Sequence, residues 1–421
     1  MTKASQRQSF FILLVTSLFF FYEFGLNNIF DVLEQPIANA YHLGATEMGF
    51  LASLYLYANL LFLIPAGALL DRFSPRWLIT SAMAVCSTGV LLVPVAHQLY
   101  VLALARFLMG IGGGFCFVGC MRIAVNWFEL KHLAAASGFI VTMGMLGGFL
   151  VQSPFAWLIG QVGWKMGLFV VALVGYAIML LIALWVRDCP QDELVAFQAQ
   201  RSQLRHHSLI ASLRSTFSKV QNWACAIYGG CMNIPLAILG AVWGVPYLTN
   251  VYGIKPLEAA LITGMLFIGT LIGSPIVGLI SDALGRRKIV MQTGCVVSIV
   301  LSLIVIHLAH PSSTLLLILY LVLGFTTSTQ VISYPTVAES NPSNVAGAAI
   351  SIISLLMVLG GIVGQPLYGW LISRDWKGQL LHGTPVYTAQ QYHHAIYVVP
   401  VIFLIGLGMT FLIRETHCRR D

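Results

Sequence analysis

The chain has 421 residues, of which 58% are hydrophobic and only 9% are charged. Because soluble domains carry about 25% charged residues, this composition excludes an ordinary soluble protein and indicates an integral membrane protein. The formal net charge of +7 follows from membrane topology, as shown below, so nucleic-acid binding is not expected. The eight cysteines show no CxxC or Cys/His zinc spacing, and we expect no disulfide, metal site or cofactor.

Apolar stretches of about 20 residues recur along the chain, the length that a helix needs to cross about 30 Å of hydrocarbon. The first follows Lys3 and Arg7 as a signal peptide would, but it is too long and no cleavage site follows it. The sequence predicts an all-α membrane protein with twelve transmembrane helices, at residues 10–31, 46–70, 77–97, 99–122, 133–158, 165–186, 222–250, 258–281, 288–308, 313–337, 346–372 and 395–414.

The longest polar stretch lies between the sixth and seventh spans. It divides the chain into an N-terminal six-helix bundle (1–186), a cytoplasmic linker (187–221) and a C-terminal six-helix bundle (222–421). With the N-terminus inside, Arg106 and Arg122 fall in the fourth span. Only four of the 22 basic residues then fall outside: Lys165, Lys255, Arg374 and Lys377. Positive charge marks cytoplasmic loops, so both termini are expected in the cytoplasm.

The two halves repeat each other. GALLDRFSPR (67–76) corresponds to GLISDALGRR (278–287) at an offset of 211 residues, and Gly147 and Gln152 correspond to Gly360 and Gln365 at an offset of 213. Trp164-Lys165 likewise corresponds to Trp376-Lys377. Six spans have therefore been duplicated in parallel, which predicts a substrate site between the two halves at the membrane midplane.

These loops approximate the signature G-x-x-x-D-[RK]-x-G-[RK]-[RK], and RFLMGIG (106–112) fits R-x-x-x-G-x-G in the fourth span. The chain resembles the major facilitator superfamily in these motifs and in its twelve spans, over essentially its whole length. The first loop departs from the signature at Ser74 and Pro75, and the second at Ala283. The resemblance implies two pseudo-symmetric six-helix bundles, a small-molecule substrate and no enzymatic activity. We expect a monomer in the plasma membrane, which in a bacterium is the inner membrane.

The paired loops are expected to form a gate. Glycine at the start of each loop lets helices approach closely, and the aspartate at the helix end can pair with bases or helix N-termini of the other half. Such pairs would hold the outward-open state, whereas the alternative is an ordinary positive-inside loop. The candidate gating residues are Gly67, Asp71, Arg72, Arg76, Gly278, Asp282, Arg286 and Arg287.

Glu23 is the acid most deeply placed in a predicted span, roughly 20 Å from the inner face at 1.5 Å per residue. Arg106, in a span of opposite direction, falls at a similar depth, and a buried charge is expensive enough to be functional by default. The resemblance lends Arg106 a role in coupling. We therefore expect Glu23 to carry a proton, since burial favours the neutral carboxyl and Arg106 the carboxylate. A static Glu–Arg pair is the alternative.

Further polar and aromatic residues inside the spans are candidates for contacting a substrate. Asn27 shares a helix face with Glu23 because four residues separate them. Arg122, near the inner end of its span, could extend to the interface or bind an anion. For each of the others, the alternative role is packing within the bundle. The candidate substrate-binding residues are Tyr22, Asn27, Tyr55, Arg122, Gln152, Asn233, Trp243, Gln330, Tyr334 and Gln365.

The function that these residues favour is secondary active transport of a small polar solute by alternating access. The buried acid favours proton-coupled symport, and the buried arginine favours an anionic or zwitterionic solute such as an organic acid, amino acid, peptide or carboxylate siderophore. Two alternatives remain: a proton-antiport exporter of drugs or metabolites, and a transporter-like receptor. No P-loop or hydrolase motif occurs, so we expect neither an enzyme nor an ATP-driven pump.

Overall fold

Helices form nearly all of the regular structure in the computed structural model, which describes residues 6–41, 45–195, 197, 199, 209–374, 376, 380–381, 384–385 and 387–419. Within these residues twelve stretches are long and apolar enough to cross a membrane. A helix satisfies its own backbone hydrogen bonds, which hydrocarbon cannot do. The twelve predicted spans and the all-α fold are confirmed.

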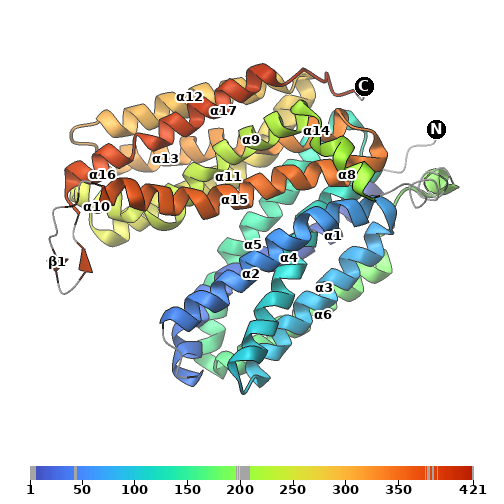
Figure 1. Cartoon of the computed structure of the whole chain (residues 1–421), viewed down its shortest axis with the longest axis horizontal. Coiled ribbons are helices and arrows are strands. Elements are labelled where there is room, and N and C mark those ends of the chain that lie inside the picture. The colour runs from blue at the N-terminus through green and yellow to red at the C-terminus, as the bar shows by residue number, and fades with distance from the viewer. Residues whose placement is uncertain are drawn as a thin grey trace.

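The N-terminal bundle contains six uninterrupted helices (blue to teal in Figure 1). Proline at the first position of α3 and glycine at the start of α6 (Gly163, φ 80°) mark two of their boundaries. α1 is ten residues longer than the expected span 10–31 at its C-terminal end. The helices are α1 (Gln6–Tyr41), α2 (Ala45–Arg72), α3 (Pro75–Val95), α4 (Leu99–Trp127), α5 (Leu133–Val162) and α6 (Trp164–Trp185), with the 3-10 turn η1 (Leu130–His132) before α5.

The C-terminal bundle (yellow to red in Figure 1) repeats this order, but two of its spans are interrupted. A π-helical segment, η3, follows Pro235, and a 3-10 segment, η4, stands in the middle of the tenth span. The elements are α9 (Val220–Pro235), η3 (Leu236–Val242), α10 (Gly244–Tyr252), α11 (Pro256–Leu284), α12 (Lys288–His307), α13 (Ser313–Thr327), η4 (Ser328–Ile332), α14 (Ser333–Glu339), η5 (Ser343–Val345), α15 (Ala346–Ser373), α16 (Ala389–Ala395) and α17 (Val398–Leu412).

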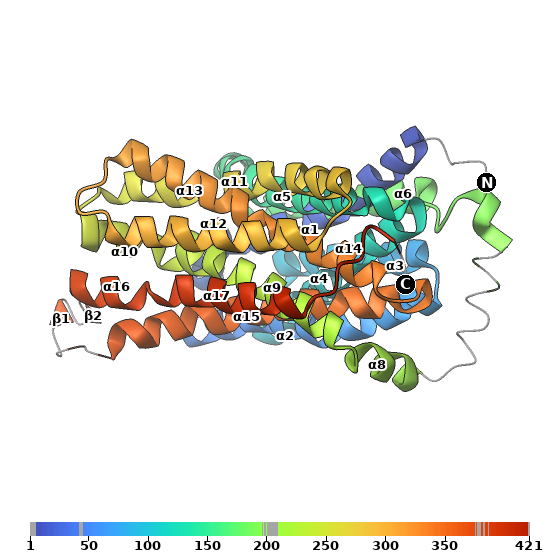
Figure 2. The same cartoon turned by 90° about the horizontal axis from the view of Figure 1, so that it is seen from above.

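Short elements complete the chain. The 3-10 turn η2 (Gln191–Glu193) and the helix α8 (Leu209–Phe217) lie between the bundles in sequence. A two-residue antiparallel pair, β1 (Leu380–Leu381) and β2 (Thr384–Pro385), lies between α15 and α16. Both termini lie at the same end of the molecule, which we call the termini end, and the opposite end is the far end (Figures 1 and 2).

The two bundles meet along two seams, α2 against α15 and α5 against α11. Glycines make the contact possible at the α2–α15 seam: a Cβ on Gly67 would stand 2.5 Å from the carbonyl oxygen of Gly347, and a Cβ on Gly347 2.7 Å from that of Gly67. The bundles lie together at the termini end and spread apart toward the far end (Figure 1).

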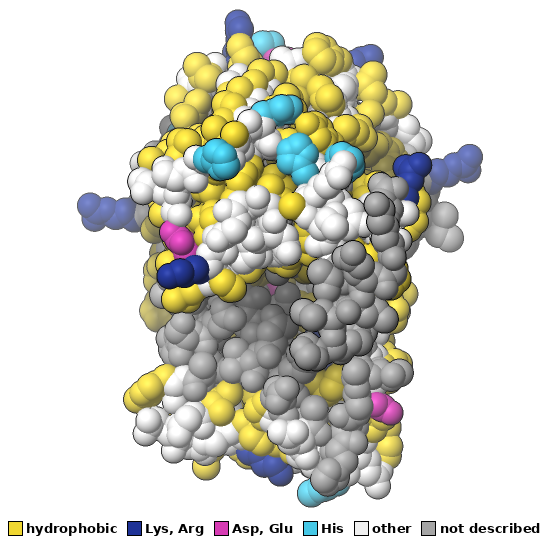
Figure 3. Space-filling view, turned by 90° about the vertical axis from the view of Figure 1, so that its left-hand side faces the viewer, with side chains coloured by type: hydrophobic (Ala, Val, Ile, Leu, Met, Phe, Trp, Pro, Cys, Tyr) yellow, Lys and Arg dark blue, Asp and Glu magenta, His cyan; other side chains and the backbone are white. Residues whose placement is uncertain are grey.

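Histidine side chains gather at the far end over the C-terminal bundle (Figure 3). His393 lies in α16, where its Nε2 is 3.0 Å from the carbonyl oxygen of Ile306, and Tyr397 Oη is 3.2 Å from His307 Nε2. Among the described residues, no three His, Cys, Asp or Glu side chains are placed to hold a metal ion. The histidines therefore join α12 to the last span.

Candidate functional site

Glu23 lies in the interior of the N-terminal bundle. Its residue is only 4% exposed, and the thiol of Cys116 in α4 is 3.5 Å from its Oε2. Its other oxygen, Oε1, has no hydrogen-bond partner among the described residues. A buried polar atom without a partner is unusual and destabilising, because it has lost water without replacement. Glu23 therefore presents an oxygen for which no described residue supplies a partner.

Two polar residues of α2 complete the surroundings of this carboxyl group. Tyr55 and Asn59 are one helical turn apart, and both point toward Gly113 of α4. The position that a Cβ would occupy on Gly113 lies 2.5 Å from Asn59 Nδ2, 2.8 Å from Glu23 Oε1 and 3.0 Å from Tyr55 Oη. Three polar groups from two helices thus converge above a residue without a side chain. We call Glu23, Tyr55, Asn59, Gly113 and Cys116 the acid cluster.

Arg106 lies two turns along α4 from Gly113. Its Nε donates to the carbonyl oxygen of Leu51 at 3.2 Å, and its guanidinium lies 5.0 Å from the centroid of the Tyr55 ring. Among the ion pairs between described residues, none joins Arg106 to Glu23. The structure therefore places Tyr55 between the base and the acid, with its ring against the guanidinium and its hydroxyl near the carboxyl.

Two candidates of the C-terminal bundle meet at Met357. The Tyr334 hydroxyl is 3.0 Å from the Met357 sulfur, and Asn233 Nδ2 is 3.5 Å from the Met357 carbonyl oxygen. The Tyr334 ring also contacts Phe117 of α4 across the bundle boundary, with 4.5 Å between ring centroids. Gln330, in η4, is buried, and its Oε1 has no partner among the residues that the structure describes. The contact between Tyr334 and Phe117 joins the C-terminal bundle to α4, the helix that carries Gly113 and Cys116 of the acid cluster.

Trp243 and Gln365 form a separate contact. The Trp243 indole donates to the Gln365 carbonyl oxygen at 3.1 Å, and the Gln365 side-chain amide donates to the carbonyl of Ala237 at 3.3 Å. Ala237 belongs to η3, whose π-type geometry is seen in the bond from Trp243 N–H to the Ile238 carbonyl. This pair joins the interrupted span to α15.

The remaining candidates lie elsewhere. Tyr22 points away from the acid cluster, since its hydroxyl donates to the Val171 carbonyl of α6 at 3.1 Å. Arg122 neither extends to the interface nor stands in the acid cluster: it is buried, and its Nε is 3.0 Å from Asp71 Oδ1. Asn27 and Gln152 lie in α1 and α5, but their side chains are outside the described residues.

The carboxylate of Asp71 bridges the α2–α15 seam. Its two oxygens accept the backbone N–H groups of Gly347 and Ala348, both at 2.9 Å. These amides are in the first turn of α15, where backbone donors have no intrahelical partner and the helix dipole favours negative charge. Arg122 supports the carboxylate from α4 and donates to Asn126 at 3.0 Å.

Asp282 does the same at the α5–α11 seam. Its oxygens accept the N–H groups of Ala135 at 2.8 Å and Ala134 at 3.4 Å, in the first turn of α5. Its base comes from its own loop, since Arg287 Nη1 is 2.6 Å away. The two seams are thus closed by the same bond, an acid of one bundle on a helix N-terminus of the other.

Arg287 is fully buried in an acidic network. It pairs with Glu339 at 2.7 Å and donates to the Leu130 carbonyl at 3.0 Å. Burial alone would lower the pKa of this guanidinium, but hydrogen bonds and the charge of Glu339, together with Asp282, outweigh burial and raise it. Arg287 therefore stays charged at any physiological pH.

Chain segments beyond the last helix of each bundle fix the gate loops. Asp188 accepts the N–H of Arg76 at 2.8 Å, and Glu415 accepts the N–H groups of Arg287 and Lys288 at 2.7 and 2.9 Å. Thr416 also donates to Glu339. Three gate candidates remain. Arg72 is half-buried and Arg286 is exposed, and a Cβ on Gly278 would collide with the carbonyl oxygen of Ala134.

Sequence reasoning missed several of these residues. Cys116, Asp188, Glu339 and Glu415 were not candidates, although Asp188 and Glu415 each follow the last span of a half by three residues. That matching spacing was a usable signal. Asn59 was not a candidate either, although its spacing of four from Tyr55 in an apolar span could be read from the sequence.

Fold and site together define a polytopic membrane protein built from two repeated helical bundles around buried polar residues. The chain belongs to the Major Facilitator Superfamily, because the model of that family matches residues 13–243 and again residues 227–420. It is therefore a multi-pass membrane transporter and not an enzyme.

Known relatives are distant. The chain is 22% identical to a protein named as a probable sulfoacetate transporter of Cupriavidus necator over 79% of this chain and 80% of that one. It is 21% identical to a probable galactarate/D-glucarate transporter of Escherichia coli over 91% and 90%. A bacterial homologue of the human lysosomal transporter Spinster, solved inward-facing and unoccupied, shares the fold with a TM-score of 0.56, 16% identity and 97% coverage of both chains.

Proposed function

We propose that this protein is a secondary active transporter that moves a small organic anion into the cell together with a proton. The observation that carries the proposal is the buried carboxyl group of Glu23, which lies in a cluster of polar groups and whose Oε1 has no partner among the described residues. Ionisable side chains inside a membrane span are expensive and mark substrate or ion pathways.

An anionic substrate is supported by Arg106 and by the names of the relatives. A guanidinium forms paired hydrogen bonds with carboxylates and sulfonates, and Arg106 is held rigidly by the Leu51 carbonyl and the Tyr55 ring. Sulfoacetate and D-glucarate, which appear in the names of two relatives, are both small acids. The hydroxyl of Tyr55 and the amide of Asn59 would add neutral hydrogen bonds to such a solute.

The proton is assigned to Glu23. A buried carboxylate is disfavoured, and protonation turns Oε1 or Oε2 into a hydroxyl that can donate to the solute. Because the Tyr55 ring lies against Arg106 and its hydroxyl faces the same point beside Gly113 as Glu23 Oε1, an anion that binds Arg106 would change the surroundings of Glu23. Solute binding and protonation would then favour each other, which is the requirement for symport.

Alternating access is assigned to the two seams. The bonds from Asp71 and Asp282 to helix N-termini hold the termini end closed while the bundles spread apart at the far end. Basic residues concentrate in the loops of the termini end, so we assign that end to the cytoplasm. The structure is then the outward-open state, and the seams separate when the solute is released inside.

The test is uptake into proteoliposomes under an inward proton gradient, with sulfoacetate, D-glucarate and gentisate as first solutes. The unaltered protein should accumulate one of them, and Glu23→Gln should lose accumulation by about tenfold or more while keeping solute exchange without a gradient. Glu258→Gln makes the same chemical change at the far end of α11 and should leave uptake intact.

Gradient-driven uptake by Glu23→Gln at the rate of the unaltered protein would refute the assigned proton site. Depletion of a preloaded solute under the same gradient would instead establish antiport. Failure of every organic anion to exchange would remove the proposed substrate class.

A further inference from the structure

A cavity of about 1020 Å³ lies at the termini end, outside the acid cluster. Its walls come from the first turns of α1 and α5, the end of α4 and one side of α11. Two of its apolar residues, Phe10 and Leu279, are 50% and 57% exposed and belong to spans. The cavity therefore opens toward lipid at the level of one membrane leaflet.

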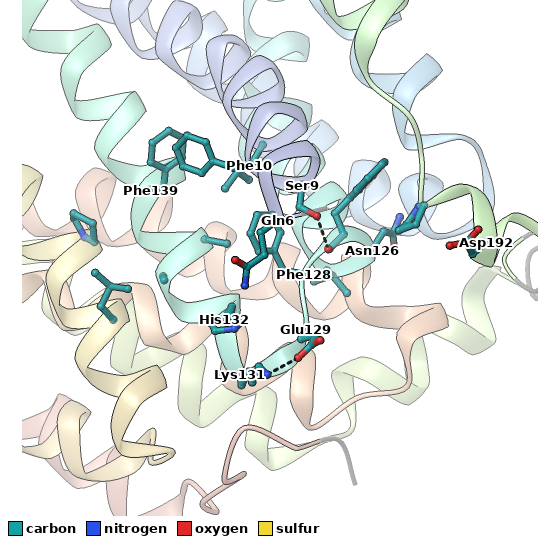
Figure 4. Close-up of a pocket in the computed structure, with 18 residues that line it drawn as sticks. Gln6, Ser9, Phe10, Asn126, Phe128, Glu129, Lys131, His132, Phe139 and Asp192 are labelled. Atoms are coloured by element: carbon teal, nitrogen blue, oxygen red, sulfur yellow. Dashed lines mark hydrogen bonds and ion pairs between the residues drawn. The ribbon is translucent and has the colours of Figure 1, made fainter. Parts of the chain in front are cut away.

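The lining changes from apolar to polar along the cavity (Figure 4). Phe10 and Phe139 lie at one end, with 5.1 Å between ring centroids, while His132, Lys131 and Glu129 lie at the other. Lys131 and Glu129 are paired at 2.8 Å and are half exposed, so both remain reachable. Gln6, Asn126 and Asp192 complete the polar part. This gradient matches an amphipathic molecule with a charged head and an apolar tail.

The other half of the molecule shows what fills the equivalent place. By the internal repeat, α1, α5 and α11 correspond to α9, α15 and α2, and the linker helix α8 packs against these three. Phe217 of α8 lies 5.7 Å from the ring of Trp223, which is 213 residues after Phe10. The amphipathic helix α8 thus covers the groove between α9, α15 and α2, which is the equivalent of the cavity in the other half. Among the described residues, no helix covers the cavity itself.

We propose that this cavity binds a membrane phospholipid, with its phosphate at Lys131 and His132 and an acyl chain against Phe10, Phe139 and Leu279. A phosphate accepts charge-assisted hydrogen bonds from these bases, and the chain replaces the apolar contacts that α8 supplies in the other groove. The acid Glu129, which lies beside Lys131 and His132, favours a headgroup that also carries an ammonium group. The site is separate from solute transport by Glu23.

The site also depends on the closed seam. Ala135 lines the cavity and donates its N–H to Asp282, while Leu279 belongs to the same helix as Asp282. When α5 and α11 separate, the wall formed by α11 moves away from the wall formed by α5. A phospholipid that contacts both walls binds the closed arrangement better and stabilises it.

Native mass spectrometry of the purified full chain tests the site. Phosphatidylethanolamine, phosphatidylglycerol and glycerol 3-phosphate are each added in turn. The unaltered protein should retain phosphatidylethanolamine best, and both Lys131→Gln/His132→Gln and Leu279→Trp should lower its retention at least about fivefold. Lys165→Gln and Leu261→Trp are matched changes at the far end and should not alter it.

Asp71→Asn lies at the other seam and changes no residue of the cavity, so reduced retention in this variant supports the dependence on the closed state. Equal retention by all variants would mean that only unspecific surface lipid is bound, and would overturn the proposal. Retention of glycerol 3-phosphate as strong as that of phospholipid would overturn the lipid assignment in favour of a soluble phosphate. Uptake assays are not part of this test, so its failure leaves the transport proposal standing.

Discussion

The absence of a side chain at position 113 leaves room for three polar groups to meet. Any Cβ there would fall within 3.0 Å of Asn59, Glu23 and Tyr55. These are ends of flexible side chains, so a methyl group would displace them without breaking the helix. The geometry of the acid cluster, more than its stability, depends on this glycine.

Gly113→Ala is therefore expected to lower solute uptake by on the order of tenfold or more, because displaced catalytic or binding groups lose much of their effect within 1 Å. Thermal stability of the purified protein should change little. Gly408→Ala, in α17, is the matched control because a Cβ there meets no atom within 4 Å. Uptake by Gly113→Ala equal to that of Gly408→Ala would show that the acid cluster has no role in transport.

At this scale the sequence predicted that Glu23 is buried, but it did not predict which residues surround it. Counting residues along the predicted spans placed Glu23 and Arg106 at a similar depth in the membrane. Such an estimate ignores helix tilt and the direction of the side chains. In the structure Gly113 and Cys116, rather than Arg106, face the carboxyl group. The contribution of α2 through Asn59 could be found only by knowing which helices are neighbours.

The interruptions η3 and η4 distinguish the C-terminal bundle from the N-terminal one. A π-helical turn frees backbone carbonyl groups that an α-helix would satisfy, and such turns occur preferentially at functional sites. Gln365 of the neighbouring helix α15 donates its side-chain amide to one carbonyl group of this segment, that of Ala237. The interrupted span is therefore held by a side chain that belongs to another element.

Gln365→Leu removes this bond and should lower the free energy of unfolding by about 1 kcal/mol, since a hydrogen bond inside a membrane protein contributes roughly that much. The measurement is the thermal midpoint of the purified protein. Gln390→Leu makes the same change at an exposed position of α16 and should leave the midpoint unchanged. Equal midpoints for the two variants would contradict the role given to Gln365.

Hydropathy predicted every span but neither interruption. Pro235 breaks the regular bonding of its helix, yet Pro65 and Pro275 stand inside helices that remain continuous. What differs is the neighbour, because Gln365 of α15 donates to the Ala237 carbonyl inside the interrupted segment. The sequence of one span does not contain that information.

Two seams, closed by equivalent bonds, hold the whole molecule in one state. The internal repeat predicted both acids, Asp71 and Asp282, since they occupy the same place in duplicated loops. It could not predict which charged residues surround these acids, because the two copies have diverged. Arg122 pairs with Asp71, whereas Arg287, itself paired with Glu339, pairs with Asp282. Glu339 lies 213 residues after Asn126, so a neutral residue of one half corresponds to a charged one of the other.

Asp71→Asn keeps the shape of the side chain but removes its charge from a helix N-terminus, an interaction that contributes about 0.3–2 kcal/mol. The termini end should open more often, by up to roughly thirtyfold at the upper limit. Spin labels at Lys131 and Leu284 lie on either side of the other seam and would report longer distances. Glu258→Gln is the matched control, and an unchanged distance distribution in Asp71→Asn would show that Asp71 does not hold the closed state.

The donors at both seams are backbone amides in the first turns of α5 and α15, which no other residue of their own helix can satisfy. Their hydrogens are shielded from deuterium only while the acid of the opposite bundle is in place. The exchange rates of Ala135, Gly347 and Ala348 therefore report opening in the unlabelled protein, one seam at a time. A solute or lipid that stabilises the closed state would slow amide exchange at both seams together. Local fraying would instead speed exchange at only one seam.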